Sequence, residues 1–139
     1  MLILSLLCII GVVSANTECI WAVGRLLCNK NQTRVLNTVI EVWDKDSAII
    51  PLLNFLNPDD KAGFTVVDNE NGIFKVEGCA ADYDLLGPLL PPNRPDFYFH
   101  VRHMCDSDKI EEVNIFPPEI VFAPRTMDYY VNSPIILDL

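Results

Sequence analysis

The stretch DFYFHVRHMC, from Asp96 to Cys105, holds the side chains best suited to chemistry: two histidines, an arginine and a cysteine. Histidine and cysteine are common zinc ligands, and a Cys/His pair can form a nucleophile. Alternate residues of a strand share a face, so His100 and His103 point to opposite sides and cannot share an ion. Attack by Cys105 with help from His103 would need a free thiolate. We expect instead that His103 is a structural histidine beside a disulfide, with no catalytic or metal site here.

The N-terminus predicts secretion. Residues 2–13 are strongly apolar and are followed by Val13-Ser14-Ala15, the small-residue pattern that signal peptidase prefers. The run is shorter than the roughly 20 residues that span a bilayer as a helix. We therefore expect a signal peptide over residues 1–15 and a single extracellular domain over residues 16–139, with no membrane span. The alternative is an N-terminal core helix.

The cysteine count follows from that cleavage. Cys8 leaves with the signal peptide, and an even set of four remains: Cys19, Cys28, Cys79 and Cys105. In an oxidising compartment this number predicts two disulfides. No CxxC spacing occurs, so a structural zinc site has little support, and no cofactor is indicated. Asn31-Gln32-Thr33 is an acceptor pattern for glycosylation, and it lies in a polar run typical of an exposed turn.

The charge excludes some classes of partner. A net charge of −9 repels phosphate backbones and anionic lipid headgroups, so we expect no nucleic-acid partner. Six acidic residues lie at expected strand ends, and we expect them to form a solvated rim at one end of the fold: Asp44, Asp46, Asp59, Asp60, Asp68 and Glu70. Calcium binding by this rim is the less favoured alternative, since Asp68-x-Glu70-x-Gly72 lacks the remaining ligands of a calcium loop.

Short alternating segments predict an all-β protein. The expected strands are residues 24–28, 36–43, 63–67, 73–77, 97–105, 110–115, 119–122 and 128–131. Asn71-Gly72 predicts a hairpin between the third and fourth of them. The prolines between Ala80 and Pro95 exclude a helix and a central strand. This pattern favours a two-sheet antiparallel β-sandwich of seven to eight strands. Cys28 and Cys105 would both face the core, and if their strands lie in opposite sheets a disulfide between them would pin the sandwich across its middle.

Two surfaces are candidates for interaction. Trp43, Tyr98 and Arg102 would share an outer face if their strands are neighbours, and exposed aromatic and arginine side chains are common in hot spots of interfaces. The alternative is that the C-terminal tail or the proline-rich crossover covers them. The apolar cluster of Leu52, Leu53 and Phe55 is either an edge strand or helical turn over the core or a lip for a lipophilic ligand or partner.

Four segments together resemble the nematode transthyretin-like family in content and order, over about residues 22–105. They are GRLLCNK (residues 24–30), VIEVWDKD (39–46), the run from Asp68 to Gly78, and Pro95-Asp96 leading to His103-Met104-Cys105. The resemblance implies a secreted transthyretin-type sandwich. It also implies a Cys28–Cys105 disulfide, which leaves Cys19 to pair with Cys79.

The resemblance implies little about activity, because members of this family are mostly secreted proteins of undefined biochemistry. The related hydroxyisourate hydrolases end in Tyr-Arg-Gly-Ser, whereas this chain ends with residues NSPIILDL, so that activity is not carried over. We expect a binding protein without catalysis whose partner is an extracellular protein or a lipophilic ligand. The alternatives are an oligomeric carrier of a lipophilic small molecule and, less favoured, a hydrolase.

Overall fold

In the part of the chain that the computed structural model describes, there are eight strands and one short helix. The structure describes residues 15–45, 59–83, 95–116, 127–130 and 133–138. Three expected features lie outside these residues: the signal segment apart from Ala15, the cluster around Leu52, Leu53 and Phe55, and the strand at 119–122. The elements are β1 (Ala15–Leu27), the 3-10 helix η1 (Gln32–Val35), β2 (Val39–Asp44), β3 (Asp60–Val66), β4 (Ile73–Tyr83), β5 (Phe97–His103), β6 (Glu111–Ile115), β7 (Met127–Tyr130) and β8 (Ile135–Ile136).

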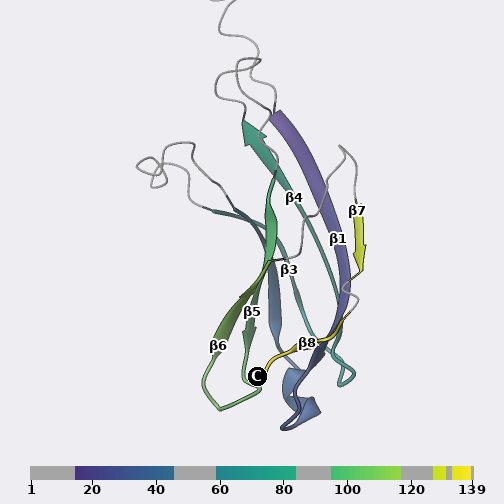
Figure 1. Ribbon diagram of the computed structural model, residues 1–139, viewed down its shortest axis with the longest axis vertical. Helices are drawn as coiled ribbons and strands as arrows, with labels where there is room; N and C mark the ends of the chain where they lie inside the picture. The colour runs from purple at the N-terminus through teal and green to yellow at the C-terminus, as the bar shows by residue number, and fades with distance from the viewer. Residues whose placement is uncertain (1–14, 46–58, 84–94, 117–126, 131–132, 139) are drawn as a thin grey trace, which may run out of the picture.

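The strands form two sheets, so the prediction of an all-β fold with two sheets is confirmed (Figure 1). One sheet has the order β4-β1-β7, with β8 pairing the end of β1, and the other has the order β3-β2-β5-β6. The sheets are mainly antiparallel, as expected, but β7 and β8 both run parallel to β1. About 100 residues of chain separate β1 from each of these two strands, and parallel pairing requires such a long connection between partners.

The core lies between the sheets and follows from the alternation of side chains. The inward positions are almost fully buried and are listed by strand: Ile20, Ala22 and Leu26 on β1; Ile40 and Val42 on β2; Phe74 and Val76 on β4; Phe97, Phe99 and Val101 on β5. Each of these side chains except Ala22 contributes about 1.5–3 kcal/mol through burial of apolar surface. The outward positions of the same strands form the two outer surfaces of the sandwich.

The segments on either side of Asn71-Gly72 do not form the expected hairpin. The turn itself is present: Gly72 has a positive φ of 71°, and the Asn69 side chain bonds the backbone N–H and carbonyl of Ile73 at 3.0 and 2.7 Å. However, β3 pairs with β2, whereas β4 pairs with β1. The turn therefore carries the chain from one sheet to the other. Strand alternation cannot distinguish this crossing from a hairpin, because it does not identify the partner of a strand.

The two sheets approach closely where β3 passes β4. A Cβ atom at Gly63 would lie 2.0 Å from the carbonyl oxygen of Glu77, and one at Gly78 would lie 2.8 Å from the carbonyl carbon of Ala62. These distances are far shorter than ordinary van der Waals contact. The pair of glycines therefore allows backbone to pack on backbone at this edge of the sandwich.

The two disulfides join Cys28 to Cys105 and Cys19 to Cys79, which are the pairs that the family resemblance implies. Cys28 follows the end of β1 and Cys105 follows the end of β5, so this bond links the two sheets. It does so at one end of the sandwich and not across its middle as expected, because each cysteine lies just beyond the last residue of its strand. Cys19 and Cys79 are direct partners in the β1–β4 register, so the second bond lies within one sheet.

No helix in the described ranges combines the length and hydropathy needed to cross a bilayer.

The close approach of β3 and β4 predicts that Gly63→Ala destabilises the fold. The added methyl group would overlap the Glu77 carbonyl, and overpacking of this kind costs about 1–3 kcal/mol or more. Urea denaturation measures the free energy of unfolding. Val66→Ala on the same strand is the control, since Val66 is half exposed. A Gly63→Ala protein as stable as this control would show that the backbones do not meet here.

Candidate interaction surface

The outward side chains of β2, β3 and β5 form one continuous surface, which we call the outer face. It is defined by the following residues: Val39, Glu41 and Trp43 of β2; Lys61, Phe64 and Val66 of β3; Tyr98, His100 and Arg102 of β5. β2 lies between β3 and β5 in the sheet. The strands that carry Trp43, Tyr98 and Arg102 are therefore neighbours, which was the condition for a shared surface.

Glu41 lies at the centre of the outer face and was not singled out from the sequence. Only 5% of the residue is exposed. Its Oε1 atom accepts hydrogen bonds from Lys61 Nζ at 2.6 Å and from Arg102 at 3.2 Å. Its Oε2 atom accepts a third from Trp43 Nε1 at 3.0 Å. A buried carboxylate needs such partners, so Glu41 fixes the positions of three side chains from three strands.

These partners also determine the ionisation of Glu41. Burial alone would raise the pKa of this carboxyl group. The hydrogen bonds from Lys61 and Trp43, together with the charges of Lys61 and Arg102, outweigh burial and hold the pKa below its usual value of 4.5. Glu41 is therefore ionised at neutral pH and forms two ion pairs on the outer face.

Tyr98 contributes less to the accessible surface than its strand position predicts. Only 9% of the residue is exposed, because its ring stacks on Phe116 at 5.1 Å between centroids and its hydroxyl donates to Asp59 at 3.0 Å. Burial, and then the Asp59 carboxylate, raise the pKa of Tyr98 to about 12. Phe116, which is 59% exposed, takes the place of Tyr98 at this border of the surface.

His100 is half-buried on the outer face. Its Nδ1 atom lies 2.6 Å from Asn114 Oδ1, and its ring meets Trp43 edge-on with centroids 6.5 Å apart. Its Nε2 atom lies 3.8 Å from Glu112. His103, in contrast, is buried on the inward side of the same strand. The two histidines thus lie on opposite faces, as alternation predicts.

Two exposed apolar side chains on β3 complete the outer face. Phe64 is 62% exposed and Val66 is 46% exposed, and Lys61 Nζ lies 4.8 Å above the Phe64 ring. Sequence reasoning missed both, because alternation does not tell which face of a short strand is inward. The signal that could have found them is Gly63, which leaves little room on the inward side.

The acidic residues do not gather at one end as expected. Asp44 and Asp60 are register partners at one end of the β2–β3 pair, whereas Asp68 follows β3 at the other end. Asp44 is also 2% exposed rather than solvated, since its side chain accepts a hydrogen bond from the backbone of Asp96 at 2.7 Å. Glu70 is exposed in the turn with Asp68, and Asp46 lies outside the described residues.

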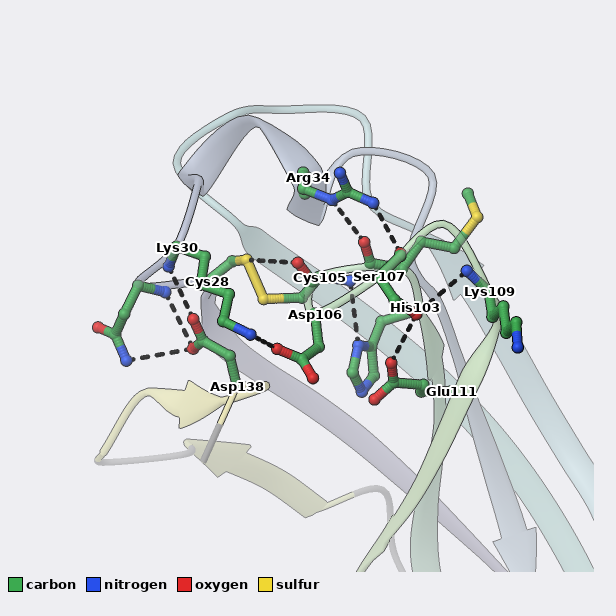
Figure 2. A network of polar contacts seen from close by, with 12 residues as sticks. Cys28, Lys30, Arg34, His103, Cys105, Asp106, Ser107, Lys109, Glu111 and Asp138 are labelled. Atoms are coloured by element: carbon green, nitrogen blue, oxygen red, sulfur yellow. Dashed lines mark hydrogen bonds and ion pairs between the residues drawn. A yellow bond between two sulfur atoms is a disulfide. The ribbon is translucent and has the colours of Figure 1, made fainter.

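The Cys28–Cys105 disulfide is enclosed by polar contacts (Figure 2). Arg34 donates to the carbonyl oxygens of Met104 and Ser107 at 2.7 and 2.6 Å. The Asp138 carboxylate accepts from the backbone N–H groups of Asn29 and Lys30 at 2.9 and 2.7 Å, and these bonds lower its pKa despite slight desolvation. These contacts hold the C-terminal segment and the loop after β5 around the bond.

Cys28, Cys105 and Asp138 are close enough together for a metal ion. The sulfur atoms are joined to each other, so they are not available as thiolate ligands in this state.

His103 has the structural role that we expected. Its Nδ1 atom accepts a hydrogen bond from the backbone N–H of Cys105 at 3.3 Å. Burial lowers its pKa from 6.5, and the charges of Glu111 and Asp138 only partly oppose this effect. The neutral ring is therefore the form that suits the folded state, next to the disulfide.

Asn31 is exposed and caps η1. Its Oδ1 atom accepts from the Thr33 backbone N–H at 3.1 Å and from the Thr33 hydroxyl at 2.8 Å. These bonds occupy the amide oxygen and leave the exposed side chain accessible from solvent. Glycosylation at Asn31 stays a prediction that this geometry permits.

No family model and no curated protein matches the chain. Among solved structures, the chain is similar to a 9R-lipoxygenase from Cyanothece PCC8801, with a TM-score of 0.42 and 22% sequence identity. The match covers 86% of this chain and 16% of the lipoxygenase chain. A likeness this weak carries no argument about function.

The Glu41 contacts predict that Glu41→Gln lowers the free energy of unfolding by about 1–2 kcal/mol at neutral pH, because charged hydrogen bonds to half-exposed partners are lost. The lowered pKa means that this contribution is complete above pH 4.5 and disappears as the pH falls through the folded-state pKa. Denaturation at several pH values measures it. Glu112→Gln, at an exposed position, is the control. A constant difference between wild type and Glu41→Gln down to low pH would contradict the ion pairs.

The lowered pKa of His103 predicts a second pH effect. Stability falls as the pH drops below 6.5, because the unfolded state binds a proton more readily than the buried ring does. The His103→Asn variant keeps an acceptor for the Cys105 N–H but should lose less stability between about pH 7 and about pH 5. His100→Asn serves as the control on the outer face. If the two variants have the same pH slope, His103 is not the group responsible.

Proposed function

We propose that the chain is a secreted, transthyretin-like binding protein without catalysis of its own, and that an extracellular protein docks on the outer face. The two-sheet fold and the disulfide pairs support the likeness to the transthyretin-like family. Two disulfides and the apolar start of the chain support secretion. The joined cysteines and the buried, hydrogen-bonded His103 support a binding role over a catalytic one.

The observation that carries the proposal is the composition of the outer face. Phe64 and Val66 are large, exposed apolar side chains. Beside them, Trp43 and Arg102 are held in fixed orientations by Glu41. Tryptophan and arginine dominate the binding energy of many interfaces, and side chains that are already ordered lose little entropy on binding. Rigid anchors next to exposed apolar surface are typical of a docking site.

Charge and shape favour a protein as the partner. Around this face the positive charges of Lys45, Lys61 and Arg102 are balanced by the negative charges of Glu41, Asp59 and Glu112, although the whole chain carries −9. An acidic partner is therefore repelled less here than elsewhere on the molecule. A sheet face is also open, whereas sites for small molecules are concave.

The proposal predicts that Phe64→Glu abolishes capture of the partner. Wild-type protein, immobilised with its disulfides intact, would be exposed to extracellular fluid of the source organism, and bound proteins identified by mass spectrometry. The added charge at a desolvated contact should lower capture at least about tenfold, as loss of a hot spot does. The matched control is Ile73→Glu, because Ile73 is 52% exposed on the other sheet.

A protein retained by wild type and by Ile73→Glu but lost with Phe64→Glu supports the outer face. Equal capture by all three proteins, or loss with Ile73→Glu alone, contradicts it.

A further inference from the structure

The two disulfides differ sharply in their access to solvent. Cys79 is exposed and Cys19 is half-buried, and their bond lies on the outward side of the β4-β1-β7 sheet, the side away from the core. Cys28 and Cys105 are only 2% and 1% exposed. We propose that Cys19–Cys79 is a thiol-exchange site, which an extracellular dithiol opens while Cys28–Cys105 stays closed.

Strand alternation explains the exposure. On β1 the even-numbered residues Ile20 and Ala22 are fully buried, so Cys19 points away from the core. On β4, Val76 is buried and the outward positions include Lys75, Glu77 and Cys79. A thiolate that attacks a disulfide must approach along the S–S axis and therefore needs an open path to one sulfur atom. Cys79 is the more exposed of the two cysteines, so we expect the thiolate to attack its sulfur atom.

The local charge does not prevent the approach of an anionic thiolate. Lys75 and Glu77 lie on the same outward side of β4 as Cys79 and have opposite charges. Lys75 Nζ also lies 5.0 Å from the centre of the Trp21 ring on β1. The charges of Lys75 and Glu77 therefore offset each other next to Cys79, although the chain as a whole carries −9 and would repel an anion elsewhere.

The reaction is an ordinary two-step exchange. A thiolate of the dithiol attacks Cys79 Sγ, the S–S bond breaks, and Cys19 leaves as a thiolate that takes a proton from water. The second thiol of the reductant then loses its proton and attacks the reductant's first sulfur atom, which is bonded to Cys79 in the mixed disulfide. This attack releases Cys79 as a thiolate, which takes up a proton. Two electrons and two protons pass to the protein, and the reductant ends as a disulfide.

The rest of the structure should survive this change. The β1–β4 register continues from Cys19–Cys79 to Arg25–Ile73 through direct strand pairing, and the core side chains of both strands lie on the opposite side of the sheet. Cys28–Cys105 still links the two sheets, enclosed by the contacts of Arg34 and Asp138. Its reduction requires local opening first, which slows it.

Partial reduction followed by alkylation tests the proposal. The folded, oxidised protein is treated with dithiothreitol, and samples are alkylated over time and digested with trypsin. Cleavage places each of the four cysteines on a separate peptide, because it follows Arg25, Lys30, Lys75, Arg102 and Lys109. We expect Cys19 and Cys79 to be labelled at least about tenfold faster than Cys28 and Cys105 in the native state.

Two controls make the result decisive. In guanidinium chloride the four rates should become similar, because selectivity arises from the fold. The paired substitution of Cys19→Ser and Cys79→Ser should remove the fast labelling and leave Cys28 and Cys105 protected. The proposal is overturned if all four cysteines react together in the native protein, if Cys28 and Cys105 react first, or if the preference persists in denaturant.

Discussion

The Cys28–Cys105 bond is the interaction on which the other features depend, because in the described residues it is the one disulfide that joins the two sheets. It closes 77 residues of chain, and in the chain-entropy model this stabilises the fold by about 4 kcal/mol. It also fixes the ends of β1 and β5 against each other. The contacts of Arg34, Asp138 and His103 all form around that fixed point (Figure 2).

With both sheets fixed, the order β3-β2-β5 determines what the outer face can do. It brings Lys61, Glu41 and Arg102 together from three strands, although they are far apart in the sequence. The ionised form of Glu41 is stabilised by both cations together with the hydrogen bond from Trp43. The same carboxylate orders Trp43, and Glu41 itself lies opposite the exposed Phe64 in the β2–β3 register. An electrostatic requirement within the sheet thus produces a rigid, partly apolar surface, which suits the binding role proposed for it.

The local features of the fold could be predicted from the sequence, and the features that depend on strand partners could not. Alternation correctly placed His100 and His103 on opposite faces and Cys28 and Cys105 in the core. It could not show that the turn at Asn71-Gly72 crosses between sheets, because both outcomes need the same turn residues. The roles of Glu41 and Asp44 were missed for a related reason. From the sequence alone, a carboxylate is expected to be exposed unless its hydrogen-bond partners are known. The partner of Glu41 on β3 and the partner of Asp44, which is the backbone N–H of Asp96, are both distant in the sequence.

Peptide mapping of the unreduced protein tests the central claim most directly. After tryptic digestion with the thiols blocked, the structure predicts that the peptide of residues 26–30 is joined to the peptide of residues 103–109, since these hold Cys28 and Cys105. It predicts no alkylated thiol on either. Finding Cys28 joined to Cys19 or Cys79, or finding Cys105 free, would contradict the linked sheets and the surfaces that depend on them.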